Sequence, residues 1–120
     1  MNANNHYTWH KIAQSVAEIN WGPNGLAELE VAGKKVCLVV QNDTIRACAH
    51  KCPHAGGAMA DGYLDALGNI VCPLHRYKFS ISNGRNTSGE GYFLKTFPVA
   101  LRADGVFIGF AQNNLFGWMK

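Results

Sequence analysis

The feature that most constrains this chain is a pair of short motifs that together offer two thiols and two imidazoles. Cys52-Pro53-His54 holds a cysteine and a histidine two positions apart, and Cys72-Pro73-Leu74-His75 holds them three positions apart. Seventeen residues separate the two motifs. Thiolate and imidazole are common ligands of zinc and iron, so the four side chains form a candidate metal site. Any fold of this chain must therefore bring two distant loops together.

Both motifs lie among residues that favour sharp turns, namely Pro53, Gly56, Gly57 and Pro73. Such residues allow the tight loops that four converging ligands require. Tetrahedral zinc also accepts two cysteines and two histidines, although structural zinc sites usually pair Cys with Cys and His with His at short spacing. The mixed pair in each loop favours another metal centre. A non-redox module that uses zinc as a staple stays open from the residues alone.

The motifs resemble the signature of the Rieske [2Fe-2S] family, in which two cysteines hold one iron and two histidines hold the other. The similarity extends from about Trp9 to Phe110 and includes Cys52-Pro-His-Ala-Gly-Gly, Asp61-Gly62-Tyr63-Leu64, Cys72-Pro-Leu-His, Phe79 and Phe97-Pro98-Val99. The resemblance implies one [2Fe-2S] cluster. It implies that Cys52 and Cys72 hold the inner iron, and that His54 and His75 hold the outer, redox-active iron near the surface.

The resemblance also implies where the potential of the cluster should lie. Two neutral imidazoles in place of two thiolates make the cluster less negative, and the class spans roughly −150 to +300 mV. High-potential members carry a Ser two positions and a Tyr four positions beyond the second His ligand, and both donate hydrogen bonds to cluster sulfurs. Tyr77 and Phe79 occupy these positions here, which predicts a low-potential carrier. Gly57 and Leu74 occupy the positions where those members have a disulfide.

Short apolar runs between turn residues predict an all-β chain. Strands are expected at residues 9–13, 26–31, 35–40, 44–49, 70–72, 77–81, 97–102 and 106–110, with one helical turn at 15–19. Ala32-Gly33-Lys34 is a hairpin signal, and Ser82-Asn83-Gly84-Arg85 is an expected turn. Such spacing favours a sandwich or a barrel. The resemblance implies a Rieske-type β-sandwich, with a cluster-binding subdomain at about residues 47–93 inserted into a base domain that both ends form.

Length, charge and hydropathy argue against several other classes of function. The length suits a single domain over residues 1–120, and a net charge of +3 without a basic cluster argues against nucleic-acid binding. The longest apolar run, Val36–Val40, is far shorter than the roughly 20 residues of a membrane-spanning helix. The polar start Met1–His6 resembles no export signal, so we expect a cytoplasmic protein.

The two remaining cysteines and His50 are not expected to be metal ligands. Cys37 and Cys48 lie in apolar runs and are expected to be free buried thiols, which suits a reducing compartment. His50 lies two residues before Cys52 and could approach the cluster without ligating it.

The expected function is that of a soluble Rieske-type ferredoxin, as in the ferredoxin components of ring-hydroxylating dioxygenases. It would pass single electrons from a reductase to an acceptor enzyme such as an oxygenase, with no catalytic residues and no small-molecule substrate of its own. A small transient interface is expected around the ligands, at Lys51, Ala55, Gly56 and Arg76. The alternative is a Rieske-like small subunit of a nitrite-reductase-type complex.

Two segments depart from the family pattern. Many Rieske proteins cover the cluster with a third loop that contains proline, whereas residues 86–93 here contain glycine instead. Beyond the last expected strand, residues 112–120 add four large apolar side chains. This tail could fold back over an apolar patch or dock a partner.

Overall fold

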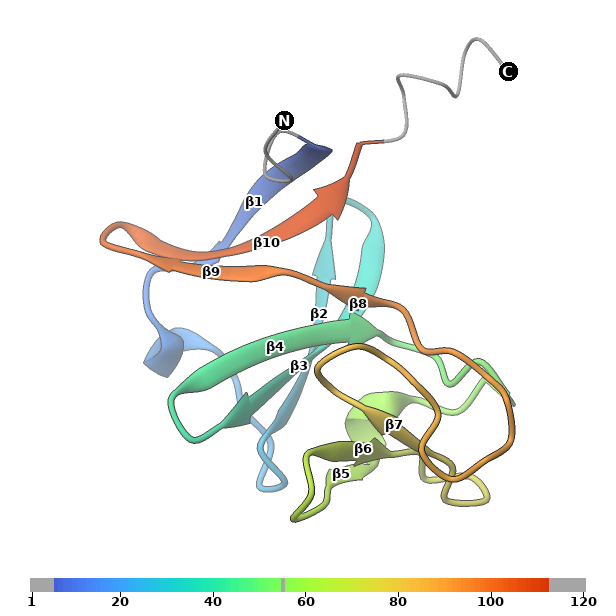
Figure 1. The fold of residues 1–120 in the computed structure, drawn as a ribbon. Helices are drawn as coiled ribbons and strands as arrows, with labels where there is room; N and C mark the ends of the chain where they lie inside the picture. Colours follow the sequence, from blue (N-terminus) through green and yellow to red (C-terminus); the bar gives the residue numbers. More distant parts are fainter. Residues whose placement is uncertain (1–5, 55, 113–120) are drawn as a thin grey trace, which may run out of the picture.

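The computed structural model describes residues 6–54 and 56–112, which form three small antiparallel sheets (Figure 1). Two short 3-10 turns, η2 (Val16–Glu18) and η3 (Met59–Asp61), lie between the strands. The strands are β1 (Tyr7–Ala13), β2 (Leu26–Val31), β3 (Lys34–Gln41), β4 (Thr44–Ala49), β5 (Tyr63–Leu64), β6 (Asn69–Val71), β7 (Lys78–Ser80), β8 (Thr96–Phe97), β9 (Val99–Arg102) and β10 (Gly105–Ala111). The prediction of an all-β chain is confirmed. No helix of the described residues is long and apolar enough to cross a membrane.

The first sheet has the strand order β1-β10-β9, the second β2-β3-β4-β8 and the third β5-β6-β7. The sequence predicted one strand over residues 97–102, but Pro98 divides it into β8 and β9. Proline lacks the N–H that a strand interior needs. The chain changes sheets at this point, because β8 pairs with β4 whereas β9 pairs with β10.

The meander β2-β3-β4 follows the sequence prediction closely. Its first turn is the two-residue pair Ala32 and Gly33, whose φ angles of 51° and 80° are both left-handed. A two-residue hairpin turn of this kind matches the right-handed twist of the flanking strands. The register then places Cys37 directly opposite Cys48.

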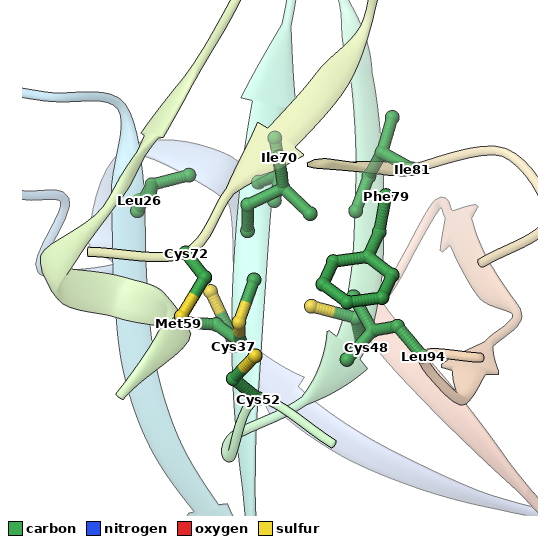
Figure 2. Close-up of a cluster of buried hydrophobic side chains, with 11 residues drawn as sticks. Leu26, Cys37, Cys48, Cys52, Met59, Ile70, Cys72, Phe79, Ile81 and Leu94 are labelled. Carbon is green, nitrogen blue, oxygen red and sulfur yellow. The ribbon is translucent and has the colours of Figure 1, made fainter. Parts of the chain in front are cut away.

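The second sheet is covered on both faces, which explains the continuous apolar run in β3. Val36 and Leu38 face the core shared with the first sheet, whereas Cys37 and Val39 face the core shared with the third sheet. Figure 2 shows the second of these cores, whose buried members are Leu26, Cys37, Val39, Cys48, Cys52, Met59, Ile70, Cys72, Phe79, Ile81 and Leu94. The candidate metal ligands with sulfur therefore belong to a packed core.

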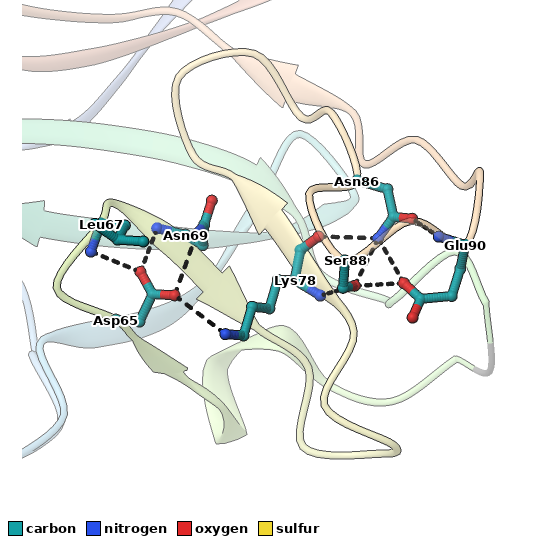
Figure 3. Close-up of polar contacts among 7 residues, drawn as sticks. All are labelled: Asp65, Leu67, Asn69, Lys78, Asn86, Ser88 and Glu90. Atoms are coloured by element: carbon teal, nitrogen blue, oxygen red, sulfur yellow. Dashed lines mark hydrogen bonds and ion pairs between the residues drawn. The ribbon is translucent and has the colours of Figure 1, made fainter.

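The third sheet lies between β4 and β8 in the chain, and its strands are only two or three residues long. Asp65 organises its first turn, because its Oδ1 accepts the backbone N–H groups of Leu67 and Asn69, each at 2.9 Å (Figure 3). The other carboxylate oxygen accepts the amide of Asn69 at 3.2 Å and lies 3.9 Å from Lys78 Nζ. The sequence predicted β6 and β7 but neither β5 nor η3, because a two-residue strand has no periodicity to detect.

Candidate metal centre

The four predicted ligands converge on one site. Cys52 and His54 lie in the loop after β4, and Cys72 and His75 lie in the loop between β6 and β7. Ligand atoms of Cys52, His54 and Cys72 all lie within 4.8 Å of one another. Cys52 Sγ is 3.2 Å from His54 Nδ1, and His54 Nε2 is 2.9 Å from His75 Nδ1.

The two kinds of donor lie at different depths. Cys52 and Cys72 are 2% and 0% exposed, whereas His54 is half-buried and His75 is exposed. The site therefore has a buried sulfur side, which belongs to the core of Figure 2, and an imidazole side at the protein surface.

Backbone hydrogen bonds shape both ligand loops. The N–H of Cys52 donates to Gly57 O at 2.8 Å, and the N–H of Cys72 donates to Tyr77 O at 2.9 Å. In the second loop His75 and Arg76 both adopt left-handed backbone, with φ of 62° and 59°. Such a conformation costs roughly 1–3 kcal/mol for a residue other than glycine. The surrounding contacts thus hold His75 in a backbone conformation that the residue would not adopt alone.

Gly57 lets the two loops approach each other. A Cβ atom at this position would lie 3.0 Å from Leu74 Cγ and 3.4 Å from Cys72 Sγ. The backbone N–H of Leu74 in turn donates to Cys72 Sγ at 3.4 Å. The resemblance to the Rieske family implies that high-potential members carry a disulfide at the positions of Gly57 and Leu74, and neither residue here can form one.

The raised pKa of the Cys72 thiol indicates that this sulfur needs a cation in order to ionise. Burial raises the pKa of Cys72 to about 11, and its contact with Cys52 acts in the same direction, while the N–H of Leu74 opposes the shift. A buried thiol of this kind becomes a thiolate when a metal cation replaces its proton. Two buried sulfurs beside two imidazoles, with a glycine where a Cβ would crowd them, fit a metal centre with mixed Cys and His ligands.

Two tyrosines enclose His54. The rings of Tyr77 and His54 stack with centroids 3.8 Å apart, and the rings of Tyr92 and His54 meet edge to face with centroids 5.8 Å apart. Tyr77 was expected to stand where a hydrogen-bond donor to sulfur would be, and Tyr92 was not singled out at all. No periodicity in the sequence could have indicated this contact, because the two tyrosines come from separate loops.

The remaining predicted residues lie around the site. Phe79 is fully buried, and Lys51, Gly56 and Arg76 are exposed. His50 turns toward β2, where its Nδ1 lies 3.5 Å from Glu28 Oε1. The expected interface residue Ala55, and residues 113–120 of the tail, lie outside the described residues.

Comparisons with known proteins place the site in a family. Residues 8–98 match the model of the Rieske [2Fe-2S] domain. Apoptosis-inducing factor 3 of Homo sapiens is 34% identical over 106 residues, which are 87% of this chain but 17% of that protein. The ferredoxin component of the naphthalene 1,2-dioxygenase system of Pseudomonas aeruginosa is 33% identical over 79 residues, 65% of this chain and 75% of that protein.

Solved structures share the fold. The ferredoxin of carbazole 1,9a-dioxygenase from Nocardioides aromaticivorans IC177 has a TM-score of 0.73 at 22% identity, over 88% of this chain and 99% of that one. A structure named as an NADH-dependent nitrite reductase small subunit, from Mycobacterium tuberculosis, has a TM-score of 0.75 at 16% identity, over 88% of this chain and 96% of that one. The predicted β-sandwich is confirmed, and at these identities the likeness shows the fold alone.

Proposed function

This chain belongs to the Rieske [2Fe-2S] domain family, and on that basis we propose that it carries single electrons through one [2Fe-2S] cluster. Cys52 and Cys72 are the proposed ligands of the inner iron, and His54 and His75 those of the outer iron. The observation that carries the proposal is the convergence of these four side chains, with both sulfurs buried and His75 exposed.

The cluster, when bound, supplies one-electron oxidation and reduction. Cys52 and Cys72 would hold it as thiolates, and the N–H of Leu74 donates to Cys72 Sγ at 3.4 Å. His75 is exposed at the surface, where a redox partner can approach within electron-transfer distance. We assign no catalytic residue and no small-molecule substrate.

The proposed partners are a reductase that supplies the electron and an acceptor enzyme such as an oxygenase. This proposal is supported by the similarity to a dioxygenase ferredoxin component. Lys51, Gly56 and Arg76 are exposed in or beside the ligand loops. We propose that they and Ala55 together form a small transient interface with a redox partner. A cytoplasmic location is also proposed, supported by the fully buried thiols of Cys37 and Cys48, which form no disulfide although they lie opposite each other.

We further propose that residues 1–120 form a single domain in which residues of about 47–93 are the cluster-binding subdomain. The third sheet and both ligand loops lie within this range, and the pairing of β4 with β8 closes it. The first two sheets would then form the base.

The second candidate function is the small subunit of a nitrite-reductase-type complex, which the fold likeness to such a subunit supports. The two functions differ in how firmly the chain binds its partner. A large subunit that stays bound through gel filtration would favour the complex, whereas a chain that elutes alone and exchanges electrons on transient contact would favour the carrier.

Elemental analysis and EPR test the proposed cofactor. We expect two iron and two acid-labile sulfide per chain, with a reduced-state EPR spectrum whose average g lies below that of all-cysteine clusters. One zinc ion and no sulfide, in protein purified anaerobically from iron-replete cells, would refute the proposal and favour the structural zinc module.

A further inference from the structure

Residues 86–92, here called the Asn86 loop, are tied down at their base. Isolated bridges join Arg85 to Phe93 and Phe79 to Asn86. The N–H of Thr87 also donates to Lys78 O at 2.8 Å. The loop is thereby attached to β7, the strand that directly follows the second ligand loop.

The side chain of Asn86 holds the loop together from inside (Figure 3). Its Nδ2, whose two protons are shared among three acceptors, lies 2.9 Å from Lys78 O, 3.2 Å from Ser88 Oγ and 3.0 Å from Glu90 Oε1. Its Oδ1 accepts the N–H of Gly91 at 2.8 Å and also the N–H of Glu90. One amide group therefore connects β7 to three later positions of the loop.

The backbone of the loop depends on this arrangement. Gly89 and Gly91 adopt left-handed φ angles of 92° and 87°, and glycine loses more freedom on ordering than other residues do. A loop with two such residues and no proline needs other contacts to stay in one conformation. The amide of Asn86 provides them.

Tyr92, the last residue of the loop, reaches the metal centre. Its ring lies 5.8 Å from that of His54 and 5.7 Å from that of Tyr77, between centroids. Tyr77 already covers one face of His54. The order of the loop thus determines whether the second tyrosine stays beside the half-buried ligand.

We propose that Asn86 is a positioning residue for the metal centre, which holds Tyr92 against His54 and so limits the access of water and small reagents to that ligand. In this chain the hydrogen bonds of one asparagine order a loop that contains no proline. The inference rests on the proposed function, because it takes His54 to be a ligand.

The rate at which the cluster is lost to an iron chelator tests this inference in the intact holoprotein. Asn86→Ala and Tyr92→Leu should each accelerate the loss of visible absorbance about fivefold, the factor that corresponds to one lost hydrogen bond or contact of about 1 kcal/mol. The double variant should lose the cluster no faster than either single variant. Asn83→Ala is the matched control, because Asn83 Oδ1 also accepts a local N–H, that of Arg85 at 2.9 Å, but outside the Asn86 loop.

Hydrogen exchange of residues 86–92 separates positioning from simple destabilisation. Asn86→Ala should speed exchange in this segment, whereas Tyr92→Leu should leave the exchange of residues 86–91 unchanged. If Asn86→Ala does not retain a cluster, Asn86→Asp serves instead, because it keeps the oxygen acceptor and loses the Nδ2 donors. Wild-type loss rates in Asn86→Ala, or fast loss in Asn86→Ala with wild-type behaviour in Tyr92→Leu, would overturn the inference. Failure of the proposed function would show separately, as a wild-type protein without a Rieske EPR signal.

Discussion

Tyr77 lies flat on His54, with ring centroids 3.8 Å apart and an interplanar angle of 27°. The resemblance to the Rieske family implies that this position corresponds to a serine in high-potential members, where a short hydroxyl donates to a cluster sulfur. The phenol ring of Tyr77 instead covers a proposed ligand. A hydrogen bond that would stabilise the reduced state is thus replaced by a packing contact.

The first prediction concerns the reduction potential. Phe79 is fully buried beside Cys48 and Leu94 (Figure 2) and offers no hydroxyl, so the midpoint should lie at roughly −150 to 0 mV, the low end of the class. Phe79→Tyr should raise it if the new hydroxyl reaches a cluster sulfur. Protein-film voltammetry measures both values, with Phe93→Tyr as the control, because Phe93 is 63% exposed. A wild-type midpoint well above about +150 mV would contradict the reasoning from missing donors.

A second prediction tests the proposed outer ligand. His75→Cys replaces a neutral ligand with an anionic one, so a variant that retains its cluster should have a lower midpoint than the wild type and an average g nearer to that of all-cysteine clusters. EPR and voltammetry on the same sample check both effects. His6→Cys adds an exposed thiol away from the site and should change neither. An unchanged g tensor in His75→Cys would show that His75 is not a ligand.

The residues in these two predictions were identified from the sequence alone, because metal-binding motifs have a recognisable chemistry. Metal ligands are specific residue types at short spacing, so Cys52 and His54 could be recognised together. The bounds of β4 were equally accessible, because turn residues and an apolar run define them. The break at Pro98 was missed because the preceding and following residues both favour strands, and only the change of sheet separates them.

The contacts around His54 could not be predicted in this way. Tyr77 and Tyr92 are fifteen positions apart and meet only because the Asn86 loop folds back over the second ligand loop. The polar contacts of Asn86 likewise depend on backbone geometry that no composition rule specifies. Sequence reasoning therefore identified the four side chains that converge at the candidate site and most strands, but not the residues that surround the site.

A third prediction concerns acid stability. Burial raises the pKa of Asp65, but hydrogen bonds from Asn69 and Leu67 and the charge of Lys78 outweigh it, so the pKa is lowered on balance. A lowered folded-state pKa stabilises the protein above the unfolded-state value of about 3.9, and this stability is lost as the pH falls through the folded-state pKa. Asp65→Asn should therefore cost about 1–2 kcal/mol at pH 7 and progressively less below about pH 4.

Urea denaturation of both proteins across this pH range measures the difference. Asp43→Asn is the control, because Asp43 is exposed in the turn between β3 and β4. A difference between wild type and Asp65→Asn that stays constant from pH 7 to pH 3 would rule out the stabilising role of the ionised carboxylate.

A fourth prediction concerns Gly84. Its φ is 80°, and a Cβ atom there would lie 1.8 Å from Leu94 O. Gly84→Ala should destabilise the protein by at least about 3 kcal/mol, since left-handed strain adds to a backbone clash. Gly33→Ala has the same φ of 80° with nothing within 4 Å and should cost only about 1–2 kcal/mol. Thermal unfolding that ranked the two variants equally would contradict the close approach at Gly84.

The last prediction concerns removal of the metal. Strands of two and three residues cannot form a stable sheet alone, and the third sheet is built from such strands. Chelation should therefore abolish hydrogen-exchange protection in β5, β6 and β7, while β2, β3 and β4 keep most of theirs. Equal protection in the third sheet before and after chelation would show that its packing suffices without the cluster.

The pairing of β1 with β10 has a consequence for how this fold can be combined with others. Tyr7 lies opposite Ala111, and the N–H of Gln112 donates to His6 O at 2.7 Å. Both ends of the described chain thus leave from the first sheet, whereas the ligand loops emerge beside the third (Figure 1). Adjacent ends of this kind allow a domain to be fused at either end, or inserted into a surface loop of another protein, without disturbing its interior. A reductase or an oxygenase could be joined here through a short linker, and the imidazole face would remain open to the solvent.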